Sequence, residues 1–193
     1  MKSEAKIVIL VPTESEIGIF RRIMPRTDVR LAGVGPYRCA AVTAAVCAER
    51  PDWIVLAGIA GCYPESGVKV GECVLVETER TADVGSFSEG AFTDKFAERY
   101  GCPYVERFSR WPLVTSNSVS AAASPFVSRD DVQIENMEGA AFFRVCREFG
   151  IPFLELRSLS NRVGDPFARW EIGRATEELA RSLESLLELI KQS

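Results

Sequence analysis

Residues 136–165 read NMEGAAFFRVCREFGIPFLELRSLSNRVGD, a stretch that contains a helix, a stop and a buried strand in succession. Its alanine-rich part predicts a helix over 137–149, and Gly150-Ile151-Pro152 is a sequence that ends helices. The part that follows, FLELRSL at 153–159, is a mostly apolar run typical of strands covered on both faces. A helix that leads into a buried strand is the repeating unit of α/β folds.

The same alternation extends along the rest of the chain. Further buried strands are predicted at 6–11, 29–34, 53–57 and 73–76. Further helices are predicted at about 16–24, 36–48 and 171–191. In contrast, 81–111 mixes glycine, serine and charged residues, and we expect a long loop there. The pattern predicts a layered α/β sandwich.

Composition limits the class of protein. With 193 residues, 47% of them hydrophobic, we expect a single globular domain over 1–193. The net charge is −4 and no Lys/Arg run exceeds two residues, so no nucleic-acid partner is expected. The apolar run Ile7–Val11 is too short for a signal peptide or a membrane span, which predicts a cytoplasmic protein without membrane contact.

Histidine is absent, which excludes Ser-His and Cys-His nucleophiles and the commonest catalytic metal sites. Acid–base chemistry is left to carboxylates, amides or water, and we expect no metal or other cofactor. The cysteines have no CxxC spacing and predict reduced, mostly buried side chains; they are Cys39, Cys47, Cys62, Cys73, Cys102 and Cys146.

Polar residues follow three predicted strands, after Val11, Ile134 and Leu159. Because strand ends in an open α/β sheet converge on one crevice, these residues are candidates for a common ligand site. They are Thr13, Glu14 and Glu16; Glu135 and Glu138; and Ser160, Asn161 and Gly164. These residues also have a purely structural explanation. Thr13 is a typical helix cap, and glutamates in a first turn complement the helix dipole. Met137 is typical of a core residue.

Two glycine pairs have a similar ambiguity. Gly33 and Gly35 lie between a strand and a helix, but Arg38 replaces the third glycine of the GxGxxG motif, so we favour a tight turn without a ligand. Gly58 and Gly61 lie where a strand ends in small residues and backbone N–H groups are able to approach a ligand.

Arg157 is a cation on an otherwise apolar strand. An unpaired buried charge is too costly, so we expect a buried carboxylate beside it, either Glu138 or Glu135. A purely structural pair and a role in orienting Glu138 are equally open.

The ordered set VPTESEI, AGVG, VLAGIAGCYPESGVKVGECVLV and NMEG…SNRVGD resembles the purine nucleoside phosphorylase superfamily. It is most similar to the hydrolase branch, which contains methylthioadenosine/S-adenosylhomocysteine nucleosidases and, more closely, futalosine hydrolases. The resemblance covers most of the chain. It implies a three-layer αβα sandwich with a mixed central sheet, and homodimers that complete one another's pockets.

The resemblance also implies roles for individual residues. Glu16 would be the general base on the attacking water, Met137 would face the sugar, and Glu138 would hold the ribose 2'- and 3'-hydroxyls. Asn161 would stabilise the leaving purine. Backbone near Gly61 and Ser120 would line the base and the ribose.

Two departures from the family pattern matter. Adenine nucleosidases have an aspartate where this chain has Asn161, whereas futalosine hydrolases have asparagine, so hydrolysis of futalosine in menaquinone biosynthesis is the predicted activity. The segment 81–118 is short and diverged, and it should hold part of the base pocket. The alternatives are a methylthioadenosine/S-adenosylhomocysteine-type nucleosidase, a purine nucleoside phosphorylase and a non-catalytic nucleoside-binding protein.

Overall fold

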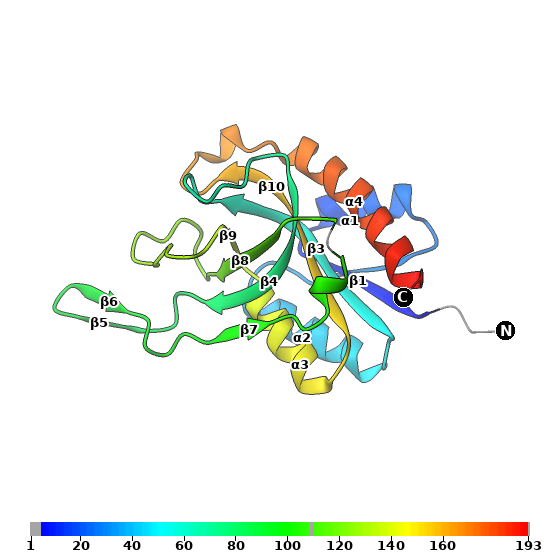
Figure 1. Ribbon diagram of the computed structural model, residues 1–193, viewed down its shortest axis with the longest axis horizontal. Coiled ribbons are helices and arrows are strands. Elements are labelled where there is room, and N and C mark those ends of the chain that lie inside the picture. Colours follow the sequence, from blue (N-terminus) through cyan, green and yellow to red (C-terminus); the bar gives the residue numbers. More distant parts are fainter. Residues whose placement is uncertain (1–4, 109, 193) are drawn as a thin grey trace.

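The computed structural model describes residues 5–108 and 110–192. Its centre is a mixed sheet (Figure 1) built from β1 (Ile7–Val11), β2 (Asp28–Leu31), β3 (Trp53–Cys62), β4 (Cys73–Thr81), β7 (Arg99–Gly101), β8 (Leu113–Ser118), β9 (Ile134–Asn136) and β10 (Phe153–Arg162). The strand order is β10-β4-β8-β9-β3-β1-β2. β7 pairs with residues 78–80, near the carboxyl end of β4. Within this order β1, β2, β3 and β10 run parallel, whereas β4 is antiparallel to β10 and β9 is antiparallel to β3.

Two long strands close part of the sheet on itself. β3 pairs with β10 along most of its length and also pairs with β1 at its start and with β9 at its end. Since β10 also pairs with β4, five strands form a closed circuit, which the sequence pattern did not predict. The closure places Gly61 between two neighbours, Asn161 on β10 and Glu135 on β9.

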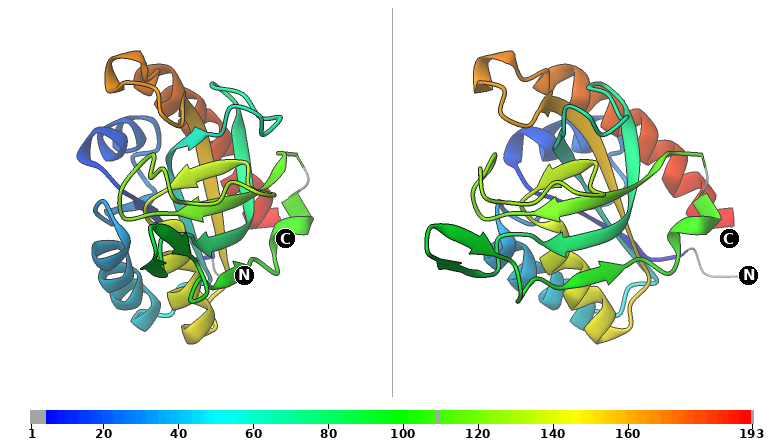
Figure 2. Two further views of the ribbon diagram at one scale, coloured as in Figure 1. Left: turned by 90° about the vertical axis from the view of Figure 1, so that its left-hand side faces the viewer. Right: turned by 60° about the vertical axis from the view of Figure 1, so that its left-hand side comes forward.

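The helices that cover the sheet in the described part of the chain are α1 (Glu14–Ile23), α2 (Pro36–Ala48), α3 (Gly139–Phe149) and α4 (Ile172–Gln192). α2 packs against α3 and α1 packs against α4, and the two pairs lie on opposite sides of the strands (Figure 2). α4 buries its apolar stripe against β3 and β10, as its three- and four-residue spacing predicts. α3 ends at Gly150, whose φ of 65° is the left-handed conformation that glycine adopts without strain.

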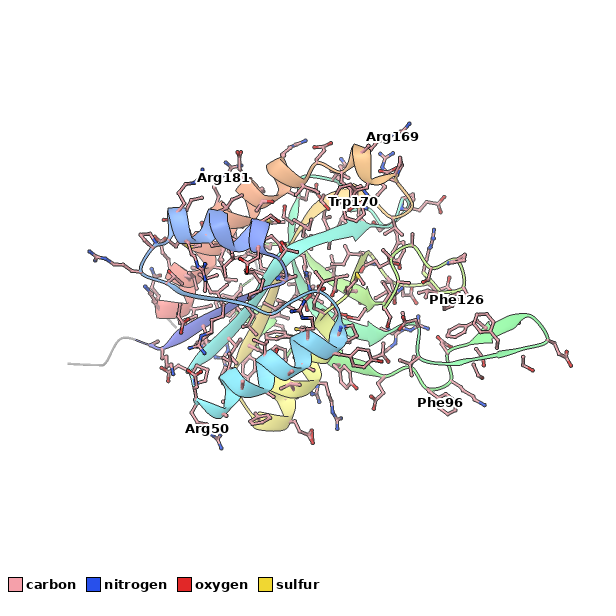
Figure 3. All side chains as sticks on the ribbon, turned by 180° about the vertical axis from the view of Figure 1, so that it is seen from behind. Arg50, Phe96, Phe126, Arg169, Trp170 and Arg181 are labelled. Atoms are coloured by element: carbon pink, nitrogen blue, oxygen red, sulfur yellow. The ribbon has the colours of Figure 1, made fainter. Side chains whose placement is uncertain are left out.

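The segment 81–111 is more regular than predicted. β5 (Ser86–Ser88) and β6 (Ala91–Thr93) form a hairpin that projects from the body of the molecule (Figure 1), and β7 returns to pair with β4. The hairpin turn is possible because Glu89 and Gly90 both have positive φ, 51° and 82°. Phe126, labelled in Figure 3, packs on this hairpin with ring centroids 5.2 Å from Phe87 and 4.7 Å from Phe92. β8 was also missed by the sequence pattern.

All six cysteines are free and buried, as predicted. Across 5–108 and 110–192, no helix is both long and apolar enough to cross a membrane.

Candidate active site

One cavity of about 390 Å³ lies where the predicted strand ends meet. The segments that follow β1, β9 and β10 all reach it, although β9 runs antiparallel to β3. The residues that line it are Pro12, Thr13, Glu16, Val34, Ile59, Ala60, Gly61, Ala122, Ala123, Glu135, Asn136, Met137, Glu138, Ser160, Asn161, Val163, Gly164, Asp165 and Trp170. Glu14 does not line the cavity. The expected convergence is confirmed for the other candidates, which are Thr13, Glu16, Glu135, Glu138, Ser160, Asn161 and Gly164.

Glu16 is fixed at the start of α1. It forms a capping box with Thr13, whose backbone N–H and hydroxyl donate to Oε2 at 3.0 and 2.6 Å. Ile59 N–H on β3 donates to the other oxygen, Oε1, at 2.9 Å. The residue is only 2% exposed. Burial raises the pKa of Glu16 above its ordinary value of 4.5, while the bonds from Thr13 and Ile59 oppose the shift. Glu16 is thus both a cap residue and an oriented carboxylate facing the cavity.

Asn136 caps α3, so the Glu138 side chain does not have to. The Asn136 side-chain oxygen accepts from the backbone N–H groups of Glu138 and Gly139 at 2.8 and 2.7 Å, so an amide caps the helix. Glu138 itself makes no side-chain cap bond. Its Oε1 instead accepts from Gly35 N–H at 3.0 Å, across the turn before α2. The glycine turn thus supplies a donor to a site carboxylate, and the positive φ of Gly35, 90°, confirms that it is a tight turn.

Arg157 is fully buried and uses all its nitrogens. Nη2 contacts Glu138 Oε2 at 3.2 Å, Nε donates to Glu155 Oε1 at 2.7 Å, and Nη1 donates to the carbonyl of Ile59 at 3.2 Å. Burial alone would lower the pKa of Arg157, but the carboxylates of Glu155 and Glu138 outweigh it and raise the pKa above its ordinary value. Pairing with Glu138 is therefore confirmed.

The alternative partner of Arg157 was wrong. The Glu135 carboxylate instead accepts from the Tyr63 hydroxyl at 2.9 Å and from Ala123 N–H at 2.7 Å. Gly58 also differs from expectation. It lies inside β3, and a Cβ there would be 2.6 Å from Arg157 Nη1, so the glycine makes room for the guanidinium.

Asn161 is held in one orientation. Its side-chain oxygen accepts from the Ser160 hydroxyl at 2.8 Å, and one N–H donates to the carbonyl of Arg162 at 3.0 Å. A Cβ on Gly61 would lie 3.1 Å from the Asn161 nitrogen, so this glycine leaves room for the amide. Asn161 ties its loop together through these two hydrogen bonds and retains a second N–H for a ligand.

Ser120 lies elsewhere. It lines a second cavity with Tyr37, Val84 and Arg144, and its backbone N–H donates to Asp83 at 2.5 Å. Met137 lines both cavities, so they adjoin at this residue.

Sequence reasoning missed Trp170 and Asp165. Trp170 lies on the connection between β10 and α4 (Figure 3), where its indole N–H donates to the Asp165 carbonyl at 3.1 Å. A single tryptophan in a loop gives no pattern that reveals this position.

The charge of the cavity is one-sided. Four carboxyl side chains line it, those of Glu16, Glu135, Glu138 and Asp165, and none of its described lining residues is lysine or arginine. Such a cavity favours a neutral ligand that becomes positive during reaction and disfavours an anion. Within the part of the chain that the structure describes, no cluster of His, Cys, Asp and Glu could hold a metal ion.

Comparisons with known proteins agree with this geometry. Residues 114–191 match the model of the phosphorylase superfamily. Futalosine hydrolase of Thermus thermophilus is 35% identical, with 80% of this chain and 78% of that protein covered. The corresponding enzyme of Streptomyces coelicolor is 30% identical, with 85% and 80% covered. The fold matches the native structure of futalosine hydrolase from Helicobacter pylori with a TM-score of 0.76 at 17% identity, over 97% of this chain and 99% of the other.

Proposed function

The chain belongs to the nucleosidase branch of the phosphorylase superfamily, together with the futalosine hydrolases, and from this we propose that it hydrolyses the N-glycosidic bond of futalosine. The products are hypoxanthine and dehypoxanthine futalosine, as in menaquinone biosynthesis. The observation that carries the choice of water over phosphate is the acidic cavity, whose described lining contains no cation. A phosphate dianion beside Glu16 and Glu138 would be repelled, whereas the oxocarbenium-like sugar of the transition state is stabilised.

Each side chain has a role that follows from its contacts. Glu16, desolvated and held by Thr13 and Ile59, accepts a proton from the attacking water. Glu138 accepts hydrogen bonds from the ribose hydroxyls, and these bonds strengthen as positive charge develops on the sugar. The free N–H of Asn161 donates to the departing purine. Met137 packs on the sugar at the junction of the two cavities.

The same site leaves three rivals: a methylthioadenosine/S-adenosylhomocysteine nucleosidase, a phosphorylase and a non-catalytic nucleoside-binding protein. One experiment separates them. Inosine, adenosine, methylthioadenosine and futalosine are each assayed for release of free base, with and without phosphate. We expect the fastest release from futalosine and no dependence on phosphate. Strong acceleration by phosphate would identify a phosphorylase, and binding without base release would identify the binding protein.

Base preference tests the role of Asn161. An amide N–H suits the acceptors O6 and N7 of hypoxanthine, whereas adenine presents a donor at position 6 and leaves a polar group poorly paired, at a cost of ~1 to 3 kcal/mol. We expect kcat/KM for a hypoxanthine nucleoside to exceed that of the matched adenine nucleoside by ~10- to 100-fold. Asn161→Asp should shift this ratio toward adenine. Both values of kcat/KM are measured on the same protein sample, so their ratio cancels any general loss of active protein. Both substrates carry the same 5' group, so they differ only in the base. An unchanged ratio would leave Asn161 with its loop contacts alone.

The acid side of the pH–rate profile tests the role of Glu16. A general base must be ionised, so kcat/KM falls as the pH drops through the pKa of Glu16, which burial places above 4.5. Thr13→Val removes a hydrogen bond that lowers this pKa, so the acid limb should move to higher pH. Thr13→Ser keeps the hydroxyl and should leave the limb in place. If the acid limb of the Thr13→Val profile stays in place or moves to lower pH, Glu16 is not the general base. The lost cap costs about 1 kcal/mol of stability.

We also propose that the chain forms one domain with the three-layer αβα arrangement of this superfamily and assembles as a homodimer. The second cavity supports the dimer, because Tyr37 and Val84, which line it, expose an aromatic ring and an aliphatic side chain. Sedimentation of the purified protein measures the assembly.

A further inference from the structure

Two buried glutamates have no part in the proposed chemistry. Glu79 on β4 and Glu155 on β10 are both 0% exposed. Their carboxyl groups meet against the first residue of α3, Gly139. A Cβ at that glycine would lie 2.2 Å from Glu79 Oε1 and 2.6 Å from Glu155 Oε2. The two carboxyl oxygens therefore face each other at a point that only glycine leaves open.

The hydrogen bonds of the two side chains are unequal. Glu79 accepts from the Ser118 hydroxyl at 2.8 Å and from the Asn136 amide at 2.6 Å, one donor for each oxygen. Glu155 Oε1 accepts from Arg157, but Glu155 Oε2 is buried, and no N–H or O–H group of the described residues donates to it. The carboxyl of Glu79 is the hydrogen-bonding group that this oxygen faces. Two ionised carboxylates have only lone pairs to offer each other, so a hydrogen bond between them requires a proton.

The charges around the pair also favour one proton between the two carboxyl groups. Among the described residues, Arg157 is the one cation paired with Glu155, and it also pairs with Glu138. Three ionised glutamates would leave this buried cluster with two uncompensated negative charges. The nearby thiols of Cys39 and Cys102 supply no charge, since burial raises their pKa to about 12 and about 11. Burial and the facing carboxyl likewise raise the pKa of Glu79, and burial raises that of Glu155.

The pair is connected to Glu138 and Glu16, the two carboxylates with a proposed role in turnover. Glu155 Oε1 accepts a hydrogen bond from Arg157 Nε at 2.7 Å. The other end of the guanidinium contacts Glu138 and the Ile59 carbonyl, and the N–H of Ile59 donates to Glu16. Rotation of the guanidinium would therefore disturb Glu138 directly and Glu16 through one residue of β3.

We propose that Glu79 and Glu155 share a single proton and act as one positioning unit, which fixes Arg157 so that Glu138 and Glu16 keep their orientation toward the substrate. The shared proton joins β4 to β10 and leaves the unit with one negative charge, so the cluster of Glu79, Glu138, Glu155 and Arg157 keeps one uncompensated negative charge instead of two. The consequence for turnover rests on the proposed nucleosidase function, whereas the shared proton does not.

Infrared spectroscopy tests the proton without any substrate. In Glu155→Gln the amide carbonyl still accepts from Arg157 and the amide N–H replaces the shared proton, so Glu79 becomes an ordinary carboxylate. The difference spectrum of wild type minus Glu155→Gln at pH 7 should contain the C=O stretching band of a protonated carboxylic acid. A difference spectrum without that band would show that the pair holds no proton and would overturn the proposal.

Turnover tests the positioning. Glu155→Gln should keep kcat within about 3-fold of wild type, whereas Glu155→Met, which removes the acceptor for Arg157, should lower kcat per folded molecule by ~10-fold or more. A purely structural role predicts a lower melting temperature for Glu155→Met with unchanged turnover, and that result would overturn the proposal. Should Glu155→Met fail to fold, Gly139→Ala replaces it, because a methyl group there separates the two carboxyls. Gly173→Ala, in open space on α4, is its matched control.

The two hypotheses can fail separately. A wild-type protein that releases no base from any nucleoside would end the proposed function while leaving the infrared result intact. The same variants are then compared by calorimetry with a purine nucleoside, where Glu155→Met should bind more weakly than Glu155→Gln. Equal affinity would reject the positioning role.

Discussion

Glu16→Gln is expected to lower kcat by ~10²-fold or more, the usual scale for a positioned general base. An amide accepts no proton at neutral pH, so the attacking water loses its base while the cavity keeps its shape. Nucleoside affinity should persist, because Glu138, Met137 and Asn161 remain in place. Base release measured at saturating futalosine, together with calorimetric affinity, separates loss of chemistry from loss of binding.

The structure supplies a matched control for this substitution. Glu14 lies in the same first turn of α1 but is exposed and does not line the cavity, so Glu14→Gln should leave turnover unchanged. Glu16→Gln also turns one amide N–H toward donors that the carboxylate satisfied, at Thr13 or Ile59, with a stability cost of about 1 to 3 kcal/mol. Thermal melting must show the variant folded at the assay temperature. A folded Glu16→Gln protein with turnover within a few-fold of wild type would remove Glu16 from the mechanism.

Much of the fold was predictable because its signals are local. The apolar runs at β1, β3 and β10 reflect strands covered on both faces, and the helix ends follow from Pro36, Gly150 and the Thr13 capping box. The site was predictable for a related reason. Strand ends converge in α/β sheets, so polar residues after three strands indicated one cavity before any contact was known.

The missed parts of the fold depend on contacts between distant residues. β8 and β7 are strands because β4 pairs with both, and nothing in their own short sequences requires it. β3 and β10 extend past their predicted ends for the same reason. The small residues there looked like a strand terminus, yet Gly58 and Gly61 are glycines because Arg157 and Asn161 occupy the space of their side chains.

The missed parts of the site have a similar origin. Asn136 appeared to be a residue between two glutamates, whereas its amide caps α3 and bonds to Arg157 at 3.1 Å. Glu155 was not predicted to have any role. Its meaning depends on Glu79, which is far away in sequence and reaches it only after β4 and β10 have paired. The groups that line the cavity were easier to identify from the sequence than the groups that hold them in place.

Arg157→Met is expected to have the largest effect on stability. Three glutamates, Glu79, Glu138 and Glu155, would remain buried around the position without their cation. Removing one partner of a buried ion pair costs about 3 to 5 kcal/mol, because the remaining charge stays uncompensated. At roughly 2 to 4 °C per kcal/mol for a chain of this size, the melting temperature should fall by about 6 to 20 °C. Circular dichroism melting measures the change.

Turnover per folded molecule then decides between the two roles left open for Arg157. Nη2 lies 3.2 Å from Glu138 Oε2, and Nη1 holds the carbonyl of Ile59, the residue whose N–H donates to Glu16. We therefore expect kcat to fall by ~10-fold or more beyond the loss of folded protein. Arg157→Lys keeps the charge but lacks the planar fork that reaches Glu155, Ile59 and Glu138 together, so it should recover stability better than turnover. Arg157→Met protein that melts early yet turns over at the wild-type rate below its melting temperature would show that Arg157 only neutralises buried charge.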